Sequence, residues 1–333
     1  MPRITSPAAI PPSPSQRNRP HGSNYIDPAA LMRIKNLQLR AKVVVDGFLS
    51  GMHKSSIHGF SVEFTEYRAY SPGDDLRYLD WRLLARSDRY YLKRFEDETN
   101  LRCWLLVDLS RSMGFRSLEY DKAEYARTAA ATIAYFLSLQ RDAVGLITFD
   151  QAIQEYLPAR FRPGHMHRLM LCLERALAGQ ATDLEAPLEQ IARTARKRGL
   201  VVLLSDLLAP VEAIETRLGY LRSRGHDIAV FRIVDPAEVE FPFAEESLFF
   251  DLETGRELYV DPLAVRERYR RQYVEHSRAM KSVCQTLGAD YYEVTTDRPL
   301  DQVLTDLLHS RMRRGRLGAR RRRQVRAALS GGA

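Results

Sequence analysis

From residue 101 onward, short apolar runs alternate with longer stretches in which apolar residues recur at helical spacing. The short runs are rich in Val, Ile and Leu, as expected of strands that are buried on both faces of a sheet. The predicted strands are Leu101–Val107, Ala143–Phe149, Leu200–Leu204, Ile228–Val234 and Asp290–Val294. The predicted helices are Leu118–Gln140, Met166–Ala178, Leu184–Arg198, Val211–Arg224, Pro262–Leu287 and Asp301–Ser310. This alternation predicts an α/β domain with a doubly wound, mostly parallel sheet and helices on both faces.

Residues 247–260 interrupt the alternation with two short apolar segments. Leu248-Phe249-Phe250-Asp251 and Leu258-Tyr259-Val260 flank a Thr254-Gly255 turn signal. Two short apolar runs around a glycine-containing turn are typical of a β-hairpin. We therefore expect an inserted two-stranded hairpin within the main domain, which we assign to residues 99–310.

The region before the main domain has a different pattern. Residues 1–23 are rich in Pro, Ser and Arg and are predicted to be disordered. Residues 24–98 are predicted to form a helix and a small β-rich module. Asp27 and Pro28 suit the N-cap and first turn of a helix from Ala29 to about Val45. The aromatic-rich segments Phe60–Tyr70 and Tyr90–Asp97 indicate strands, with a helix over Leu76–Ala85 between them.

The net charge of +8 is unevenly distributed along the 333 residues. Residues 311–333 contain nine arginines and no Asp, Glu or Lys, so residues 1–310 are close to neutral. Such an Arg-rich tail is typical either of a solvated disordered segment or of an electrostatic contact with an anionic partner. Residues 311–326 offer no aromatic ring for stacking on bases, so any nucleic-acid contact is expected to be non-specific.

The cysteines and the apolar segments bear on the cellular compartment. Cys103, Cys172 and Cys284 form no C-x-x-C pair, which favours a reducing environment without a disulfide framework. Apolar stretches such as Ala129–Leu139 fall short of the ~18 residues needed to span a bilayer. The N-terminus has no apolar core of a signal peptide. These features predict a soluble, cytoplasmic protein with no membrane span.

Three regions near the expected carboxyl ends of the strands carry polar oxygen groups. Asp108-x-Ser110-x-Ser112 comes directly after a strand, Thr182-Asp183 starts a helix, and Ser205-Asp206 follows another strand. Ligands of such sheets lie beyond the carboxyl ends of the strands. Carboxylate and hydroxyl oxygens suit a hard cation such as Mg²⁺. The alternative is a set of polar loop residues that cap helices without a metal.

These residues resemble the metal-ion-dependent adhesion site of von Willebrand factor A domains. The resemblance implies a divalent cation, Mg²⁺ or else Mn²⁺ or Ca²⁺, with one position open for a partner's carboxylate. The implied metal ligands are Asp108, Ser110, Ser112, Thr182 and Asp206. Asp183, beside Thr182, is an alternative ligand at that position.

The upstream region resembles the domain-of-unknown-function 58 (DUF58) family. The segment from Glu63 to Trp81 reads EFTEYRAYSPGDDLRYLDW, and Ala85-Arg86 and Lys93-Arg94-Phe95-Glu96 follow it. The resemblance covers roughly residues 45–310. It implies a von Willebrand factor A-like domain that acts with a MoxR-type AAA+ ATPase in assembly, activation or metal insertion. The charges of Gly73–Trp81 suit either a network that joins the small module to the main domain or a surface for partner docking.

The motifs of common enzyme classes are absent from the sequence. There is no Walker A string, no Gly-x-Gly-x-x-Gly after a strand and no Gly-x-Ser-x-Gly, so neither nucleotide binding nor a serine hydrolase is indicated. We therefore expect a non-enzymatic, metal-dependent protein-interaction protein, whose partner is a MoxR-type AAA+ ATPase or its client. The alternative is a Mg²⁺-dependent hydrolase, a phosphatase or nuclease, for which Asp183 is the nearest candidate base.

Overall fold

The computed structural model describes residues 26–54, 67–69, 91–93, 101–175, 185–194, 198–245, 247–250 and 257–308. A six-stranded sheet, with the strand order β10-β7-β6-β3-β4-β5, forms its centre. The strands are β3 (Arg102–Asp108), β4 (Ala143–Phe149), β5 (Ile153–Arg160), β6 (Leu200–Ser205), β7 (Asp227–Val234) and β10 (Asp290–Thr295). Every pairing is parallel except that of β5 with β4. The predicted α/β fold with a mostly parallel sheet is confirmed, and its topology agrees with the von Willebrand factor A-like fold that the resemblance implies.

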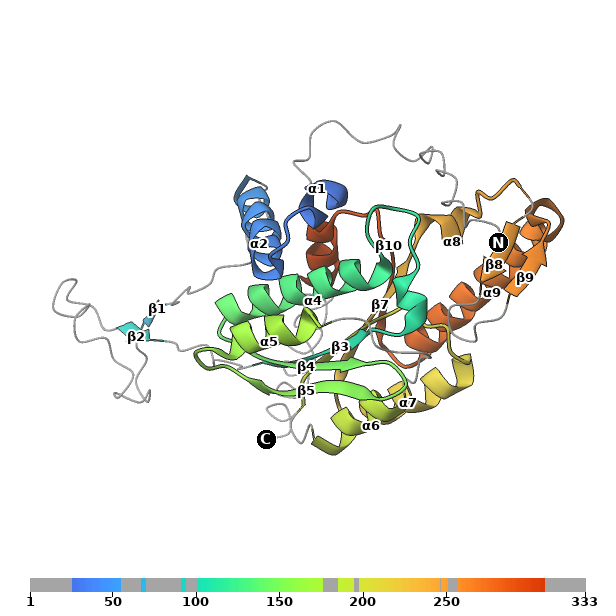
Figure 1. Ribbon diagram of the computed structural model, residues 1–333. Coiled ribbons are helices and arrows are strands. Elements are labelled where there is room, and N and C mark those ends of the chain that lie inside the picture. The colour runs from blue at the N-terminus through green and yellow to red at the C-terminus, as the bar shows by residue number, and fades with distance from the viewer. Residues whose placement is uncertain are drawn as a thin grey trace.

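Helices cover both faces of the sheet (Figure 1). One face carries α1 (Pro28–Met32), α2 (Leu37–Lys54), α4 (Lys122–Leu139), α5 (His165–Leu173) and a helix over residues 300–308. The other carries α6 (Glu185–Thr194), α7 (Val211–Ser223) and α9 (Pro262–Thr286). Alternate residues of β3 enter the two cores, Leu105 and Val107 on the α4 side and Leu106 on the α7 side. This alternation explains why the strand is apolar throughout.

The predicted single helix from Ala29 to Val45 is wrong, because α1 and α2 are separate helices. Asn36 Oδ1 accepts a hydrogen bond from the Leu39 backbone N–H at 2.8 Å, so a new helix starts there. The Arg40 guanidinium donates to the Met32 carbonyl at 2.7 Å and also to the Ile34 carbonyl. These bonds satisfy backbone carbonyls that the break leaves without helical partners.

Two elements of the main domain do not follow from the apolar pattern. Strand β5 lies at the edge of the sheet, half of its residues are only partly buried, and it contains Pro158. An edge strand needs no continuous apolar run and tolerates proline, so the sequence signal is weak. Helix α8 (Pro236–Glu240) is a single short turn that Asp235 caps.

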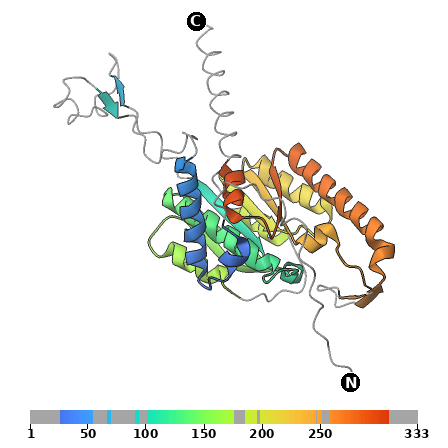
Figure 2. The same ribbon diagram turned by 90° about the horizontal axis from the view of Figure 1, so that it is seen from above.

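The predicted inserted hairpin is present. Strands β8 (Ser247–Phe250) and β9 (Glu257–Val260) pair antiparallel, with Phe250 opposite Glu257, and lie beside the start of α9 (Figure 2). The Thr254-Gly255 turn lies outside the described residues. Upstream, β1 (Tyr67–Ala69) and β2 (Tyr91–Lys93) form a second antiparallel pair.

Other expectations fall on parts of the chain that the structure does not describe. These are residues 1–23, the Leu76–Ala85 helix, the Gly73–Trp81 string and the tail over residues 311–333. Within the described ranges, no helix combines the length and the apolarity needed to cross a membrane.

Candidate functional site

The candidate metal ligands lie where the winding of the sheet reverses. Strands β3 and β6 are adjacent, but the chain continues from β3 to the β4 side and from β6 to the β7 side. Asp108 is the last residue of β3, and Asp206 comes directly after β6. Both side chains are buried, with 0% and 1% exposure. The crevice at such a switch point is the usual ligand site of doubly wound sheets.

The loop after β3 brings two hydroxyl groups next to Asp108. The Ser110 backbone N–H donates to Asp108 Oδ1 at 2.9 Å, which turns the chain sharply at the end of the strand. A 3₁₀ helix over Arg111–Gly114 follows and holds the Ser112 Oγ 3.1 Å from the Ser110 Oγ. Three of the five predicted ligands therefore lie together in one buried turn.

Ser205, which is not among the predicted metal ligands, also belongs to this site. Its Oγ donates to Asp108 Oδ2 at 2.6 Å and accepts the Leu207 backbone N–H at 3.0 Å. The hydroxyl thus fixes the second oxygen of Asp108 from the neighbouring strand. Its position beside Asp206 in the sequence was the available signal.

A buried lysine also belongs to the site and was missed. Lys122 is 0% exposed, and its Nζ donates to Asp206 Oδ2 at 2.9 Å and to Glu238 Oε1 at 2.7 Å. Lys122 lies on the same helical stripe as Ala126, Ala130 and Ile133, so its inward position was visible in the sequence. Its acidic partners, which lie 84 and 116 residues away, were not.

Burial and like charge determine the electrostatics of the cluster. Burial, and after it the charge of Asp206, raises the pKa of Asp108 to about 7. Burial also raises the pKa of Glu238, against the opposing effect of Lys122. Burial works to lower the pKa of Lys122, but Asp206 and Glu238 outweigh it and the pKa is raised. Lys122 pairs with Asp206 and Glu238, whereas Asp108 is opposed by the charge of Asp206, so an added cation would relieve the repulsion between the two aspartates.

The donor set fits a hard divalent cation. Asp108 and Asp206 supply carboxylates and Ser110 and Ser112 supply hydroxyls, all of them oxygen donors of the kind that Mg²⁺ takes. Across the described ranges, no cluster of three or more His, Cys, Asp or Glu residues is arranged to hold a metal. The candidate site therefore depends on hydroxyl as well as carboxylate oxygens. Thr182 and its alternative Asp183 lie outside the described residues.

Comparison with known proteins identifies the family. Residues 66–279 match the model of the family described as protein of unknown function DUF58, which is more than half of the chain. This chain belongs to the DUF58 family. It is 31% identical over 277 residues to the uncharacterized protein Rv1480 of Mycobacterium tuberculosis (strain H37Rv), covering 82% of this chain and 86% of that protein.

Solved structures similar to this DUF58 chain have low sequence identity. An aerotolerance-related membrane protein from Bacteroides fragilis is 15% identical, with a TM-score of 0.45, and the match covers 62% of this chain and 96% of that one. The SpRpn10 VWA domain is 12% identical, with a TM-score of 0.37, and the match covers 61% of this chain and 93% of that domain.

Proposed function

We propose that this DUF58 protein is a metal-dependent protein-interaction protein and not an enzyme. The observation that carries the proposal is the burial of Asp108 and Asp206 beside the hydroxyls of Ser110 and Ser112 at the switch point of the sheet. In this proposal the divalent cation is Mg²⁺, or Mn²⁺ or Ca²⁺. It is held by Asp108, Ser110, Ser112, Thr182 and Asp206, and it offers an open position to a carboxylate of the partner.

The charge around the loop supports an acidic partner. Arg111 lies in the 3₁₀ turn that carries Ser112, Arg116 lies in the loop just after it, and both are exposed. Exposed arginines beside a recognition site attract carboxylate-bearing surfaces and raise the rate of association. We infer that the partner presents an acidic segment to this edge of the sheet.

The contacts of the neighbouring polar groups favour binding over catalysis. A metal-dependent hydrolase needs a general base or nucleophile beside the cation. Here the Ser205 hydroxyl donates to Asp108, and Lys122 is held between Asp206 and Glu238. Glu238 Oε2 also accepts the Asp235 backbone N–H and so caps α8. Each of these described groups is thus committed to a structural contact.

The proposed partner is a MoxR-type AAA+ ATPase, or a client protein that such an ATPase remodels. This part rests on the resemblance of residues 45–310 to DUF58 proteins. Nucleotide hydrolysis then belongs to the ATPase, in keeping with the absence of a Walker A string from this sequence.

The first experiment measures metal binding by the full chain. Wild type and the variants Asp108→Ala and Asp150→Ala are titrated with Mg²⁺ and Mn²⁺ by calorimetry and then melted with and without the ion. Asp150 is a matched control because it is also a buried aspartate that follows a strand, but its Oδ1 is occupied by Ala152 and Gln154 within the β4–β5 hairpin. We expect one saturable site and a raised melting temperature in wild type and Asp150→Ala only. Equal responses from all three proteins would refute the metal site.

The second experiment tests the partner and the enzymatic alternative. The MoxR-type ATPase encoded in the same genome is purified, and its binding to this chain is measured in Mg²⁺ and in EDTA. We expect binding that EDTA and Asp108→Ala both abolish. Wild-type protein that hydrolyses a phosphate monoester or DNA in Mg²⁺, with that activity lost in Asp108→Ala, would establish the hydrolase in its place.

A further inference from the structure

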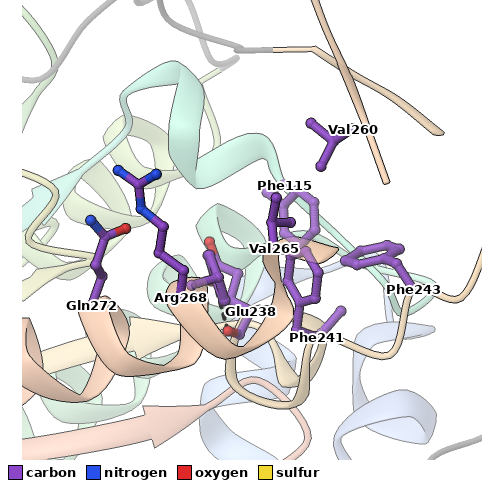
Figure 3. Close-up of a pocket in the computed structure, with 10 residues that line it drawn as sticks. Phe115, Glu238, Phe241, Phe243, Val260, Val265, Arg268 and Gln272 are labelled. Atoms are coloured by element: carbon purple, nitrogen blue, oxygen red, sulfur yellow. Dashed lines mark hydrogen bonds between the residues drawn. The ribbon is translucent and has the colours of Figure 1, made fainter. Parts of the chain in front are cut away.

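Figure 3 shows an aromatic pocket whose lining includes Phe115, in the loop that follows the metal-site serines. Its volume is about 440 Å³, which is within the range of natural ligand pockets. The apolar lining comes from the loop after the 3₁₀ helix, from α8 and the segment after it, from β9 and from α9. The apolar side chains that define it are Phe115, Phe241, Phe243, Val260, Val265 and Tyr269. Glu238, Arg268 and Gln272 contribute polar groups.

Lys122 connects the pocket with the metal site, because it contacts residues of both. Phe115, three positions after Ser112, has its ring centroid 6.0 Å from Lys122 Nζ, which itself lies 2.9 Å from Asp206 Oδ2. The ring centroid therefore lies no more than about 9 Å from Asp206 Oδ2, the length of two to three residues of extended chain. Glu238 lines the pocket and is the second partner of Lys122. A bound peptide segment of this length therefore spans the distance between the pocket wall and the metal site.

The wall of the pocket is held in place by packing and hydrogen bonds. The rings of Phe241 and Tyr269 are 4.5 Å apart, and those of Phe241 and Phe243 are 5.2 Å apart. The Tyr269 hydroxyl donates to the Glu238 carbonyl at 2.8 Å, and Arg266 donates to the Phe243 carbonyl at 2.6 Å. A pre-organised aromatic pocket loses little conformational entropy when an apolar group enters it.

We propose that this pocket receives a large apolar side chain of the partner segment whose carboxylate binds at the cation site. The partner motif is thus a carboxylate with an aromatic or large aliphatic residue two or three positions away. This inference rests on the proposed function and deepens it. Charge complementarity supports an acidic peptide as the occupant, because Arg268 is exposed at the pocket and Arg111 and Arg116 are exposed on the metal-site loop. A buried aromatic side chain in such a pocket is the typical energetic centre of an interface.

The test uses fluorescein-labelled peptides and the full-length protein in Mg²⁺, with binding followed by fluorescence anisotropy. Each peptide carries one aspartate and one phenylalanine, two or three residues apart and in either order. Matched peptides replace the phenylalanine by alanine or the aspartate by asparagine. For at least one spacing, we expect loss of the phenylalanine to weaken binding about tenfold or more, and loss of the aspartate to remove the dependence on Mg²⁺.

Protein variants separate the pocket from the metal site. Val265→Trp fills the pocket, and Val274→Trp places the same ring on the opposite face of α9, at a residue that is 41% exposed and outside the lining. We expect the preference for phenylalanine to disappear in Val265→Trp and to persist in Val274→Trp. Arg268→Glu is expected to weaken binding of every acidic peptide more than Arg270→Glu, an exposed control outside the lining.

These experiments distinguish failure of the pocket inference from failure of the proposed metal-dependent function. Mg²⁺-dependent binding that ignores both the phenylalanine and Val265→Trp overturns the pocket inference and leaves the proposed function intact. A preference for phenylalanine that survives EDTA and Asp108→Ala also overturns it, because the pocket then takes an apolar ligand independently of the cation. Failure of every peptide to bind a protein that binds Mg²⁺ overturns it as well. A protein that binds no Mg²⁺ fails at the proposed function itself.

Discussion

The Lys122 ammonium lies 2.9 Å from Asp206 Oδ2 and 2.7 Å from Glu238 Oε1, and its side chain has no exposed surface. One buried positive charge therefore joins the candidate metal site to the wall of the aromatic pocket. Burial disfavours the charge of this ammonium, and the two carboxylates that face it outweigh that effect. Any event that withdraws a carboxylate from Lys122 at one site must alter its contact with the other.

Replacement of this ammonium tests the charge balance of the cluster. We expect Lys122→Met to lower the free energy of unfolding in EDTA by about 3–5 kcal/mol, because it leaves buried carboxylates without a counter-charge. A divalent cation can supply part of that charge, so the increase in melting temperature that Mg²⁺ produces should be larger than in wild type. Both quantities come from denaturation curves with and without Mg²⁺.

Lys281→Met is the matched control for this substitution, because Lys281 lies exposed on α9. Its effect on the free energy of unfolding should stay within about 0.5 kcal/mol. A loss of similar size in the two variants would show that Lys122 makes no special contribution.

The Ser205 hydroxyl is expected to position Asp108 for the cation without binding the cation itself. It donates to Asp108 Oδ2 at 2.6 Å, and the groups that orient metal ligands typically affect metal affinity by about 10–100-fold. We expect Ser205→Ala to retain one Mg²⁺ site with about tenfold weaker affinity in a calorimetric titration. Ser138→Ala, which removes a hydroxyl bound to the Tyr135 carbonyl in α4, should leave the affinity unchanged. Equal affinities in both variants would argue against this role.

The parts of the fold that could be predicted from the sequence are those with a local physical signal. Strands β3 and β6 are buried on both faces, so the interior of each appears as an uninterrupted apolar run. Strand β7 has the same apolar pattern apart from the buried Arg232. Strand β5 has water on one side and no such run. The break between α1 and α2 involves the Asn36 cap, which is local, and the bonds of Arg40 to earlier carbonyls, which helical periodicity does not encode.

The residues of the candidate site also divide into those with a local sequence signal and those whose contacts depend on the topology. Asp108, Ser110 and Ser112 are close in sequence and follow a predicted strand, so their grouping could be anticipated. The contribution of Asp206 required only the rule that parallel strands end at one edge. The ion pair of Lys122 with Glu238 spans 116 residues, and it exists only because α8 returns to the start of α4. Such a contact depends on the whole topology.

The cysteines should be unreactive in the native protein. All three are buried, and burial raises the pKa of Cys284 to about 11. Burial together with the nearby Glu155 raises the pKa of Cys172. Because the thiolate is the reactive form, alkylation at about pH 8 should be slow until the protein is unfolded by guanidinium. Mass spectrometry after a short pulse of iodoacetamide measures this for each cysteine, and rapid native labelling of Cys284 would contradict the expectation.

Arg40 should determine whether α1 stays attached to the main domain. Its guanidinium donates to the Met32 carbonyl at 2.7 Å and pairs with Glu124 on α4 at 2.7 Å, and its side chain is only 8% exposed. Arg40→Met retains the aliphatic stem but leaves Glu124 and the carbonyls at the helix break without this donor. We expect it to lower the free energy of unfolding by about 1–3 kcal/mol and to speed proteolysis near residues 33–36.

Arg33→Met is the control for this substitution. It removes the Arg33–Glu119 pair, in which both side chains are largely exposed, and should change neither measurement, since exposed ion pairs contribute little. Equal proteolysis rates for Arg40→Met and Arg33→Met would mean that the packing of Leu31 and Met32, and not the guanidinium, holds α1 in place.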